Sequence, residues 1–88
     1  MVLEATRPAV LALGEVEVIP APTGDPAALV VEGHPIPVAS IHNRWRIDDL
    51  RYARARTAIY FAARLETGDL ITLSHDRTDN TWDLRRIG

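Results

Sequence analysis

Residues 59–73 read Ile-Tyr-Phe-Ala-Ala-Arg-Leu-Glu-Thr-Gly-Asp-Leu-Ile-Thr-Leu, and this stretch decides the fold. Apolar residues alternate with other residues on both sides of a short polar loop that contains Gly68. Alternation with a period of two is typical of half-buried strands, and a glycine in so short a loop is typical of a hairpin. The stretch therefore predicts two antiparallel strands.

The spacing also predicts how these two strands are paired. If residues 66–68 form a three-residue loop with Gly68 left-handed, Ala63 lies opposite Ile71 and Phe61 lies opposite Leu73. The large apolar side chains then share one face of the hairpin. A two-residue turn would instead place a charged arginine opposite Ile71, so we predict the first register. On the outer face it places Tyr60, Arg64 and Thr72.

A third strand is predicted at residues 81–87, after a polar turn at residues 76–80. It contributes Trp82 and Leu84 to the inner face, and the three strands form a meander. Before the hairpin, residues 15–19 and 27–32 are two further strand candidates, and residues 33–34 form a turn. We expect residues 1–26 to be an N-terminal strand with a Pro-rich linker, because three prolines and a glycine interrupt residues 20–26. Residues 27–88 are then the β module.

The run at residues 35–47 is predicted to be extended but bent. Its apolar residues occupy even positions at Ile36 and Val38 and odd positions at Ile41, Trp45 and Ile47. A regular strand cannot keep all of them on one face, so we predict a β-bulge near residues 39–40, which also bends the strand. The two prolines at its start place the first half at a sheet edge.

Residues 48–56 fit either a connecting loop or a short helical turn capped by Asp48. We predict one helical turn there at most. In total the sequence predicts an all-β fold of about five strands, either a small, strongly bent antiparallel sheet or an SH3-like barrel.

Composition restricts the class of protein. The chain has 88 residues and no cysteine, so it forms one small domain without disulfides or a thiolate zinc site. Because the chain has no cysteine, we expect it in the reducing cytoplasm. We also expect it to be soluble, because the apolar run at residues 9–13 is too short to span a membrane. Self-association is also expected, since it can stabilise a domain with so small a core.

Arginine is concentrated in the middle of a chain whose net charge is −2. Residues 44–64 contain six arginines and two aspartates, and the chain has no lysine. The arginines fit a phosphate-binding stripe, but they also fit a solvated face paired with carboxylates, and coding bias alone can favour arginine over lysine. The candidate contacts for a partner or a nucleic acid are Arg44, Arg46, Arg54, Arg56, Tyr60 and Arg64.

Catalytic and metal-binding patterns are weak. The three histidines lack the spacing of a zinc site. His75 and Asp76 are adjacent on a strand and therefore point to opposite faces, which disfavours a general-base pair. The acidic residues at 76–83 lack the order of a calcium loop. We therefore expect no enzymatic activity, no metal and no cofactor.

Several of these motifs together resemble a family of short bacterial domains of unknown function. The resemblance covers residues 33–86 and rests on Trp45-Arg-Ile-Asp-Asp49, Tyr60-Phe61, Leu65-Glu66-x-Gly68-x-Leu70-x-x-Leu73-x-x-Asp76 and Trp82. Such domains are often encoded with DNA-repair genes, and a similar module ends the catalytically inactive Y-family polymerase homologues of the bacterial mutasome. This sequence departs from the family at Arg51 and Tyr52, where relatives typically have a Trp pair, and its final strand is less aromatic.

The resemblance implies a role in DNA-damage tolerance or repair, with a component of a repair polymerase assembly as partner. Together with the residues, it predicts a non-enzymatic protein-interaction module that uses an exposed sheet face or edge, such as residues 35–40 or 81–87. The alternative is a nucleic-acid-binding module that uses the arginines and an exposed aromatic.

Overall fold

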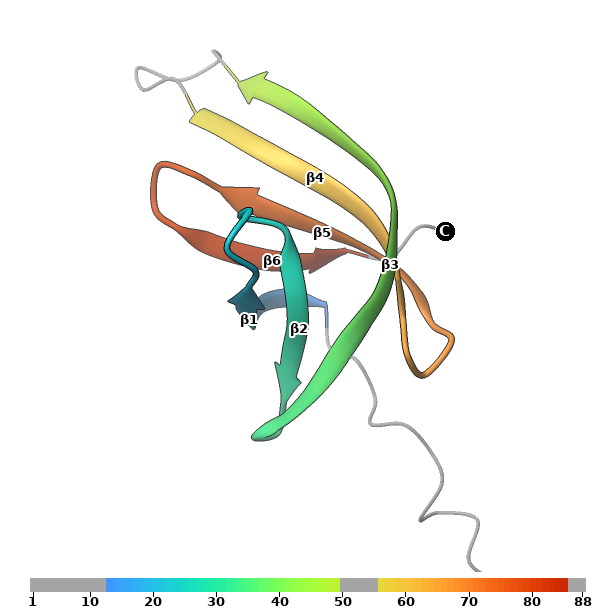
Figure 1. Cartoon of the computed structure of the whole chain (residues 1–88). Helices are drawn as coiled ribbons and strands as arrows, with labels where there is room; N and C mark the ends of the chain where they lie inside the picture. Colours follow the sequence, from blue (N-terminus) through green and yellow to red (C-terminus); the bar gives the residue numbers. More distant parts are fainter. Residues whose placement is uncertain (1–12, 50–55, 86–88) are drawn as a thin grey trace, which may run out of the picture.

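The computed structural model describes residues 13–49 and 56–85, which form a six-stranded barrel (Figure 1). Every strand is antiparallel to its neighbours, and the strands follow the order of the chain around the barrel. The all-β prediction is confirmed, with six strands in place of about five. The strands are β1 (Gly14–Pro20), β2 (Pro26–Val31), β3 (His34–Asp49), β4 (Arg56–Leu65), β5 (Leu70–Asp76) and β6 (Thr81–Arg85).

Strand β1 closes the barrel, because it pairs with β2 on one side and with β6 on the other. The Pro-rich segment after it is a compact turn. Within this turn the Ala21 N–H donates to the Asp25 carbonyl at 2.7 Å, and the Gly24 N–H donates to the Ala21 carbonyl at 2.9 Å. The next turn has Glu32 and Gly33 at its centre, both with positive φ. That turn lies one residue earlier than predicted, and His34 already belongs to β3.

The hairpin of β4 and β5 has the predicted register. Phe61 pairs with Leu73 and Ala63 pairs with Ile71. Gly68 has a φ of 96°, the left-handed conformation that the three-residue loop requires. Strand β6 then pairs with β5, which confirms the meander.

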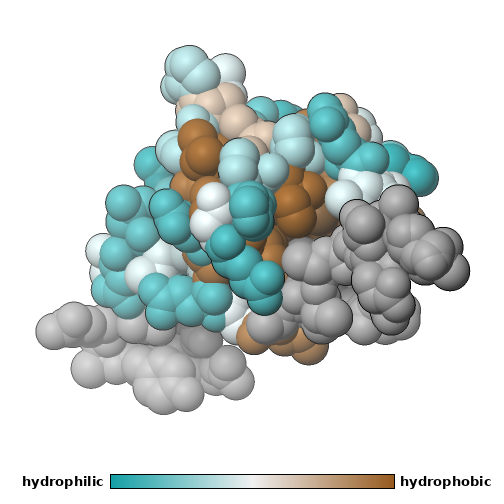
Figure 2. Space-filling model, turned by 90° about the horizontal axis from the view of Figure 1, so that it is seen from below, coloured by the Kyte–Doolittle hydropathy of each residue, from teal (hydrophilic) through white to brown (hydrophobic). Residues whose placement is uncertain are grey.

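The core lies on the inner face of β4, β5 and β6, together with one residue of β2. Its two aromatic rings, Phe61 and Trp82, lie 5.7 Å apart between centroids. Seen from below, apolar side chains are visible between hydrophilic ones on this face of the barrel (Figure 2). The buried apolar residues are Leu29, Phe61, Ala63, Leu65, Ile71, Leu73, Trp82 and Leu84.

Strand β3 bends through two irregularities in its pairing with β4. The register shifts between Val38 and Ser40, where a bulge was predicted, and again between Ile41 and Asn43. Each shift adds one residue to β3 that has no counterpart in β4, so each reverses which side the following residues face. The second shift was not predicted, and it turns Trp45 to the outer face.

The single bulge predicted near residues 39–40 would place Trp45 and Ile47 on the same face as Ile36 and Val38, and this prediction is wrong. Trp45 pairs with Tyr60 on the outer face, and 37% of Trp45 and 45% of Ile47 are exposed. Arg44 and Arg46 instead lie opposite Phe61 and Ile59 of β4, so they are on the inner side of β3, where both remain exposed.

The predicted helical turn falls partly outside the described residues. Strand β3 continues through Asp49 and β4 begins at Arg56, so Asp48 lies in a strand and does not cap a helix.

Thr72 also differs from the prediction. It lies on the outer side of β5 as predicted, but its side chain is buried. Its strand neighbour on β6 is Arg85.

Candidate functional site

The second half of β3 is an open edge of the barrel. Strand β2 pairs only with residues 34–37 of β3, whereas β4 pairs with it from Val38 to Asp49. Among the residues that the structure describes, no strand pairs with the other side of residues 41–49. In Figure 1 this part of β3 forms the free margin of the sheet next to β4. By contrast, residues 82–84 of β6 are paired on both sides, with β1 and with β5, so this part of β6 is not an edge.

Hydrogen bonds at both ends of β4 show which of its backbone groups face β5. The Leu65 N–H donates to the Asp69 carbonyl at 2.9 Å, and the Thr57 carbonyl accepts from the Arg77 N–H at 3.1 Å. In an antiparallel ladder, alternate residues direct their backbone N–H and C=O groups to the same neighbouring strand. The odd-numbered residues of β4 therefore face β5, and the even-numbered residues, such as Tyr60, face β3.

The same alternation fixes the orientation of β3. Trp45 and Ile47 lie opposite even-numbered residues of β4, Tyr60 and Ala58. Their backbone groups bond to β4. The residues that follow each of them, Arg46 and Asp48, therefore direct their backbone N–H and C=O groups toward the open side. A row of unpaired backbone groups of this kind is a template for pairing with another strand.

A side chain occupies the start of this open edge. The Asn43 side-chain Oδ1 accepts a hydrogen bond from the Arg44 N–H at 2.9 Å. Within residues 13–49 and 56–85, no side chain caps the backbone groups of Arg46 and Asp48 in this way. We define the free edge of β3 as residues 46–48.

Exposed apolar and aromatic side chains lie beside the free edge on the outer face. Trp45 stacks on Tyr60 with ring centroids 5.5 Å apart and an interplanar angle of 17°. The guanidinium carbon of Arg85 lies 5.8 Å from the centre of the Tyr60 ring, and its Nε donates to the Ser74 hydroxyl at 3.3 Å. The Arg85 side chain therefore extends over the outer face of β5 toward the stacked rings of Trp45 and Tyr60. Ile47 extends the apolar surface along β3.

The arginines on the other side of β3 are paired with carboxylates. Arg44 donates to both oxygens of Asp25, from Nε at 3.0 Å and from Nη2 at 2.6 Å. This pair links β3 to the turn between β1 and β2. The hydrogen bond from Arg44 holds the pKa of the Asp25 carboxyl below its ordinary value, and the same bond raises the pKa of Arg44.

A second pair lies on the free edge itself. The Arg46 Nε donates to Asp48 Oδ1 at 3.0 Å, and the Thr57 hydroxyl donates to the same oxygen at 2.9 Å. The hydrogen bond from Arg46, followed by that from Thr57, lowers the pKa of the Asp48 carboxyl. Both side chains of the ion pair remain about half exposed, at 62% for Arg46 and 48% for Asp48, so the pair is accessible to a binding partner.

The predicted contact residues are not on one face. Arg44 and Arg46 face the inner side of β3, whereas Tyr60 and Arg64 lie on the outer side of β4. Arg56 begins β4, and Arg54 lies outside the described residues. Sequence reasoning missed Trp45, Ile47 and Arg85 as surface residues. The exposure of Arg85 could have been predicted from the sequence, because Arg85 follows the inward-facing Leu84 on the same strand.

The histidines are dispersed over the barrel. His34 begins β3, His42 contacts the Ser40 hydroxyl at 3.1 Å, and His75 stacks on Trp82 at a centroid distance of 4.1 Å. His75 also lies 2.8 Å from Asn80 Oδ1. In the described part of the chain, histidines and acidic residues form no group of three or more that could hold a metal ion.

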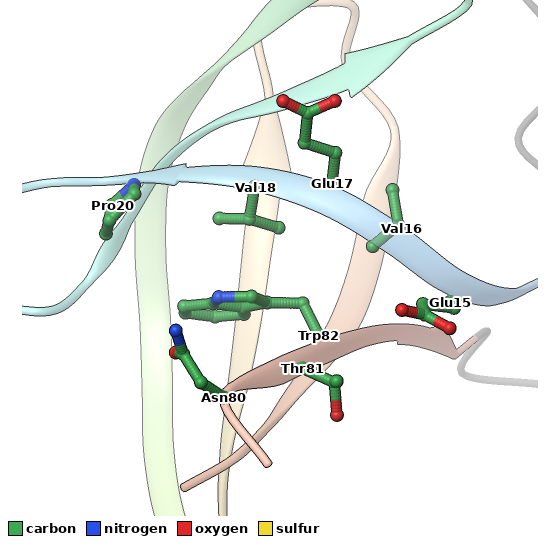
Figure 3. Close-up of a pocket in the computed structure, with 8 residues that line it drawn as sticks. All are labelled: Glu15, Val16, Glu17, Val18, Pro20, Asn80, Thr81 and Trp82. Carbon is green, nitrogen blue, oxygen red and sulfur yellow. The ribbon is translucent and has the colours of Figure 1, made fainter.

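A groove of about 410 Å³ lies between β1 and β6 (Figure 3). Val18 lies over the Trp82 ring, which has Asn80 at its side, and the Glu17 side chain points away from the ring. The ionisable groups that line the groove are Glu15 and Glu17, both exposed. The uncharged polar residues that line it are Asn80 and Thr81.

Comparisons of the chain with protein-family models, curated proteins and solved structures found no match. Within residues 13–49 and 56–85 there is no helix long and apolar enough to cross a membrane.

Proposed function

We propose that this domain is a non-enzymatic protein-interaction module that binds an extended segment of a partner protein along the free edge of β3. The proposal rests on the open side of β3, where Arg46 and Asp48 present backbone groups that no strand of the described residues pairs with. Strand addition to a sheet edge derives affinity from main-chain hydrogen bonds and specificity from alternate side chains.

The side chains around the edge suit such a partner. Trp45 and Ile47 flank Arg46 and are exposed on the outer face, so the outward side chains of an added strand contact an aromatic ring and a branched aliphatic group. Burying apolar surface of this kind contributes roughly 25 cal/mol per Å². On the inner side, the Arg46 and Asp48 pair offers both charge signs to the partner.

We place the module in the cytoplasm, in DNA-damage tolerance or repair, and we propose a component of a repair polymerase assembly as its partner. This context is supported by the resemblance of residues 33–86 to domains encoded with repair genes. The Trp-Arg-Ile-Asp-Asp motif that carries part of the resemblance is residues 45–49, which include the free edge. The motif therefore coincides with the proposed contact surface.

The first prediction concerns the apolar contact beside the edge. We expect Ile47→Lys to lose the proteins that the immobilised full chain retains from an extract of its native host, because a lysine replaces an exposed apolar group at the contact. Leu70→Lys is the matched control, since Leu70 is also an exposed aliphatic residue on a strand, 58% exposed against 45% for Ile47. It pairs with Arg64, away from the free edge.

The proteins retained by each variant are identified and quantified by mass spectrometry. The proposal expects specific partners to be retained by the wild type and by Leu70→Lys, and to be lost with Ile47→Lys. Equal retention by all three proteins contradicts a contact at β3. Thermal melts of the variants show that the loss is not caused by unfolding.

A second candidate function is binding of single-stranded nucleic acid. The specific observation in its favour is the Trp45 and Tyr60 stack with Arg85 beside it, since single-strand binders combine exposed aromatic rings with cationic groups. Two features disfavour it. Arg44 and Arg46 are already paired with carboxylates, and Asp83 pairs with Ser74 in the strand next to the aromatic pair.

We therefore expect no binding of labelled single-stranded or double-stranded oligonucleotides at physiological ionic strength, as measured by fluorescence anisotropy. Any binding at low salt should weaken steeply as salt is added, because it comes from phosphate contacts alone. Binding at physiological salt that is lost in both Tyr60→Ala and Arg85→Ala would replace the protein-interaction proposal with the nucleic-acid one.

A further inference from the structure

We infer that the free edge of β3 also pairs with the free edge of a second copy of this chain, forming a two-fold dimer centred on Ile47. The inference rests on the proposed function, because both require that this edge accepts an added strand. It goes further by identifying one occupant and one register from the charges along the edge.

Symmetry restricts the possible registers. In a two-fold antiparallel pair, the two copies of β3 present their outer faces on the same side of the joined sheet. Side chains of directly opposed residues lie on the same face, so the numbers of two opposed residues have an even sum. The residues that exchange backbone hydrogen bonds must also be those whose N–H and C=O groups face the open side. Along the open side these are Arg44, Arg46 and Asp48. At least two of these residues lie opposite one another only if the two-fold axis passes through Trp45, Arg46 or Ile47.

Charge and capping separate the three registers. If the axis passes through Trp45, Arg44 of each copy lies opposite Arg46 of the other copy, and like charges directly opposite are unfavourable. A centre at Arg46 opposes that arginine with itself and also needs the Arg44 N–H, which Asn43 already caps. A centre at Ile47 opposes Arg46 with Asp48 of the other copy twice. Only this last register pairs opposite charges throughout and uses the uncapped backbone groups.

The side chains support the same register. Each arginine then lies between two carboxylates, Asp48 of its own strand at 3.0 Å and Asp48 of the second copy. On the outer face Ile47 meets Ile47 of the second copy at a pair without backbone hydrogen bonds, where side chains approach most closely. The two ribbons of β3 and β4 join into one continuous sheet, and the partner-binding edge is covered. Dimer and partner therefore compete for the same backbone groups.

Charge reversal tests the register. We expect wild-type full chain to reach twice its 9.8 kDa mass in sedimentation equilibrium as concentration rises. Arg46→Asp or Asp48→Arg alone places like charges opposite one another twice, and each should weaken dimerisation about tenfold or more. In an equimolar mixture of the two variants opposite charges face each other again, so a heterodimer of near wild-type affinity should form.

A second test does not depend on these charges. The chain has no cysteine, so Ile47→Cys introduces a single thiol at the two-fold axis, within the separation that a disulfide spans. Mild oxidation should link two copies of Ile47→Cys much faster than two copies of the control Leu70→Cys. Equal rates of linkage would contradict the register.

A wild-type chain that stays monomeric at millimolar concentration, or single variants that dimerise like the wild type, would overturn the inference. The proposed function fails differently. If Ile47→Lys loses its partners while the wild type remains monomeric, the edge binds another protein but not a second copy. If the dimer forms as described but Ile47→Lys and Leu70→Lys retain the same partners as the wild type, self-association stands and the proposed partner site does not.

Discussion

Replacing Phe61 by alanine is expected to lower the free energy of unfolding by about 3–5 kcal/mol. Phe61 is 4% exposed, lies in the middle of β4 and packs against the ring of Trp82. A domain of this size has few other large side chains with which to fill the resulting cavity. Because small domains are only marginally stable, we expect most Phe61→Ala molecules to be unfolded at 37 °C, which urea titration followed by circular dichroism will measure.

Tyr60→Ala is the matched control for this prediction. Tyr60 is adjacent in sequence but lies on the outer face, where it stacks on the exposed Trp45. Removing an exposed stack is expected to cost about 0.5–1.5 kcal/mol. If Tyr60→Ala is the more damaging of the two substitutions, the inner and outer faces of β4 have been assigned the wrong way round.

The second large effect concerns proline at two adjacent positions of β3. Ile47→Pro removes an N–H that bonds to β4, and the ribbon of β3 and β4 should open at a cost of about 1–3 kcal/mol. Arg46→Pro removes an N–H that faces the open side, where proline is tolerated. We expect Arg46→Pro to keep the fold and to lose both the dimer and the captured partners, because it deletes a donor that both of them need.

Thermal melts and sedimentation of the two proline variants measure these effects. The orientation of the β3 backbone would be contradicted if Ile47→Pro folds normally and Arg46→Pro does not. Binding at the free edge would be contradicted if Arg46→Pro folds and still dimerises with wild-type affinity, since one of the two backbone donors of residues 46–48 would then be dispensable.

The hairpin could be predicted from sequence because its determinants are local. The loop at residues 66–68, the left-handed Gly68 and the alternation on both sides all lie within fifteen residues and agree with one register. The same holds for β6, where Trp82 and Leu84 alternate inward. Local agreement of turn chemistry and apolar period leaves few alternatives.

The outward orientation of Trp45 could not be predicted, because its apolar ring favours burial whereas the backbone register places it on the outer face. One bulge was sufficient to place Ile41, Trp45 and Ile47 on a common inner face, and apolar side chains are usually inside. No distinctive residue in the sequence indicates the second shift, between Ile41 and Asn43. This shift reverses the faces, so two apolar side chains lie on the outer face and two exposed arginines lie on the inner side, where each pairs with a carboxylate.

The candidate site depends on contacts that local patterns do not contain. Arg44 meets Asp25 across 19 residues of sequence, and this contact exists only because β3 bends toward the turn between β1 and β2. The free edge depends in turn on where β2 stops pairing with β3. The arginine cluster was visible in the sequence, but its division between two faces follows from the two bulges.

Amide hydrogen exchange measured by NMR shows directly whether the free edge of β3 binds other strands. In dilute monomeric protein we expect the amides of Arg46 and Asp48 to exchange rapidly, whereas those of Trp45 and Ile47 are protected by β4. At concentrations where the chain dimerises, or after addition of a captured partner, Arg46 and Asp48 should become protected as well. If these two amides are as protected as Trp45 in the dilute protein, or remain unprotected when the dimer or partner is bound, the free edge of β3 is not the binding surface.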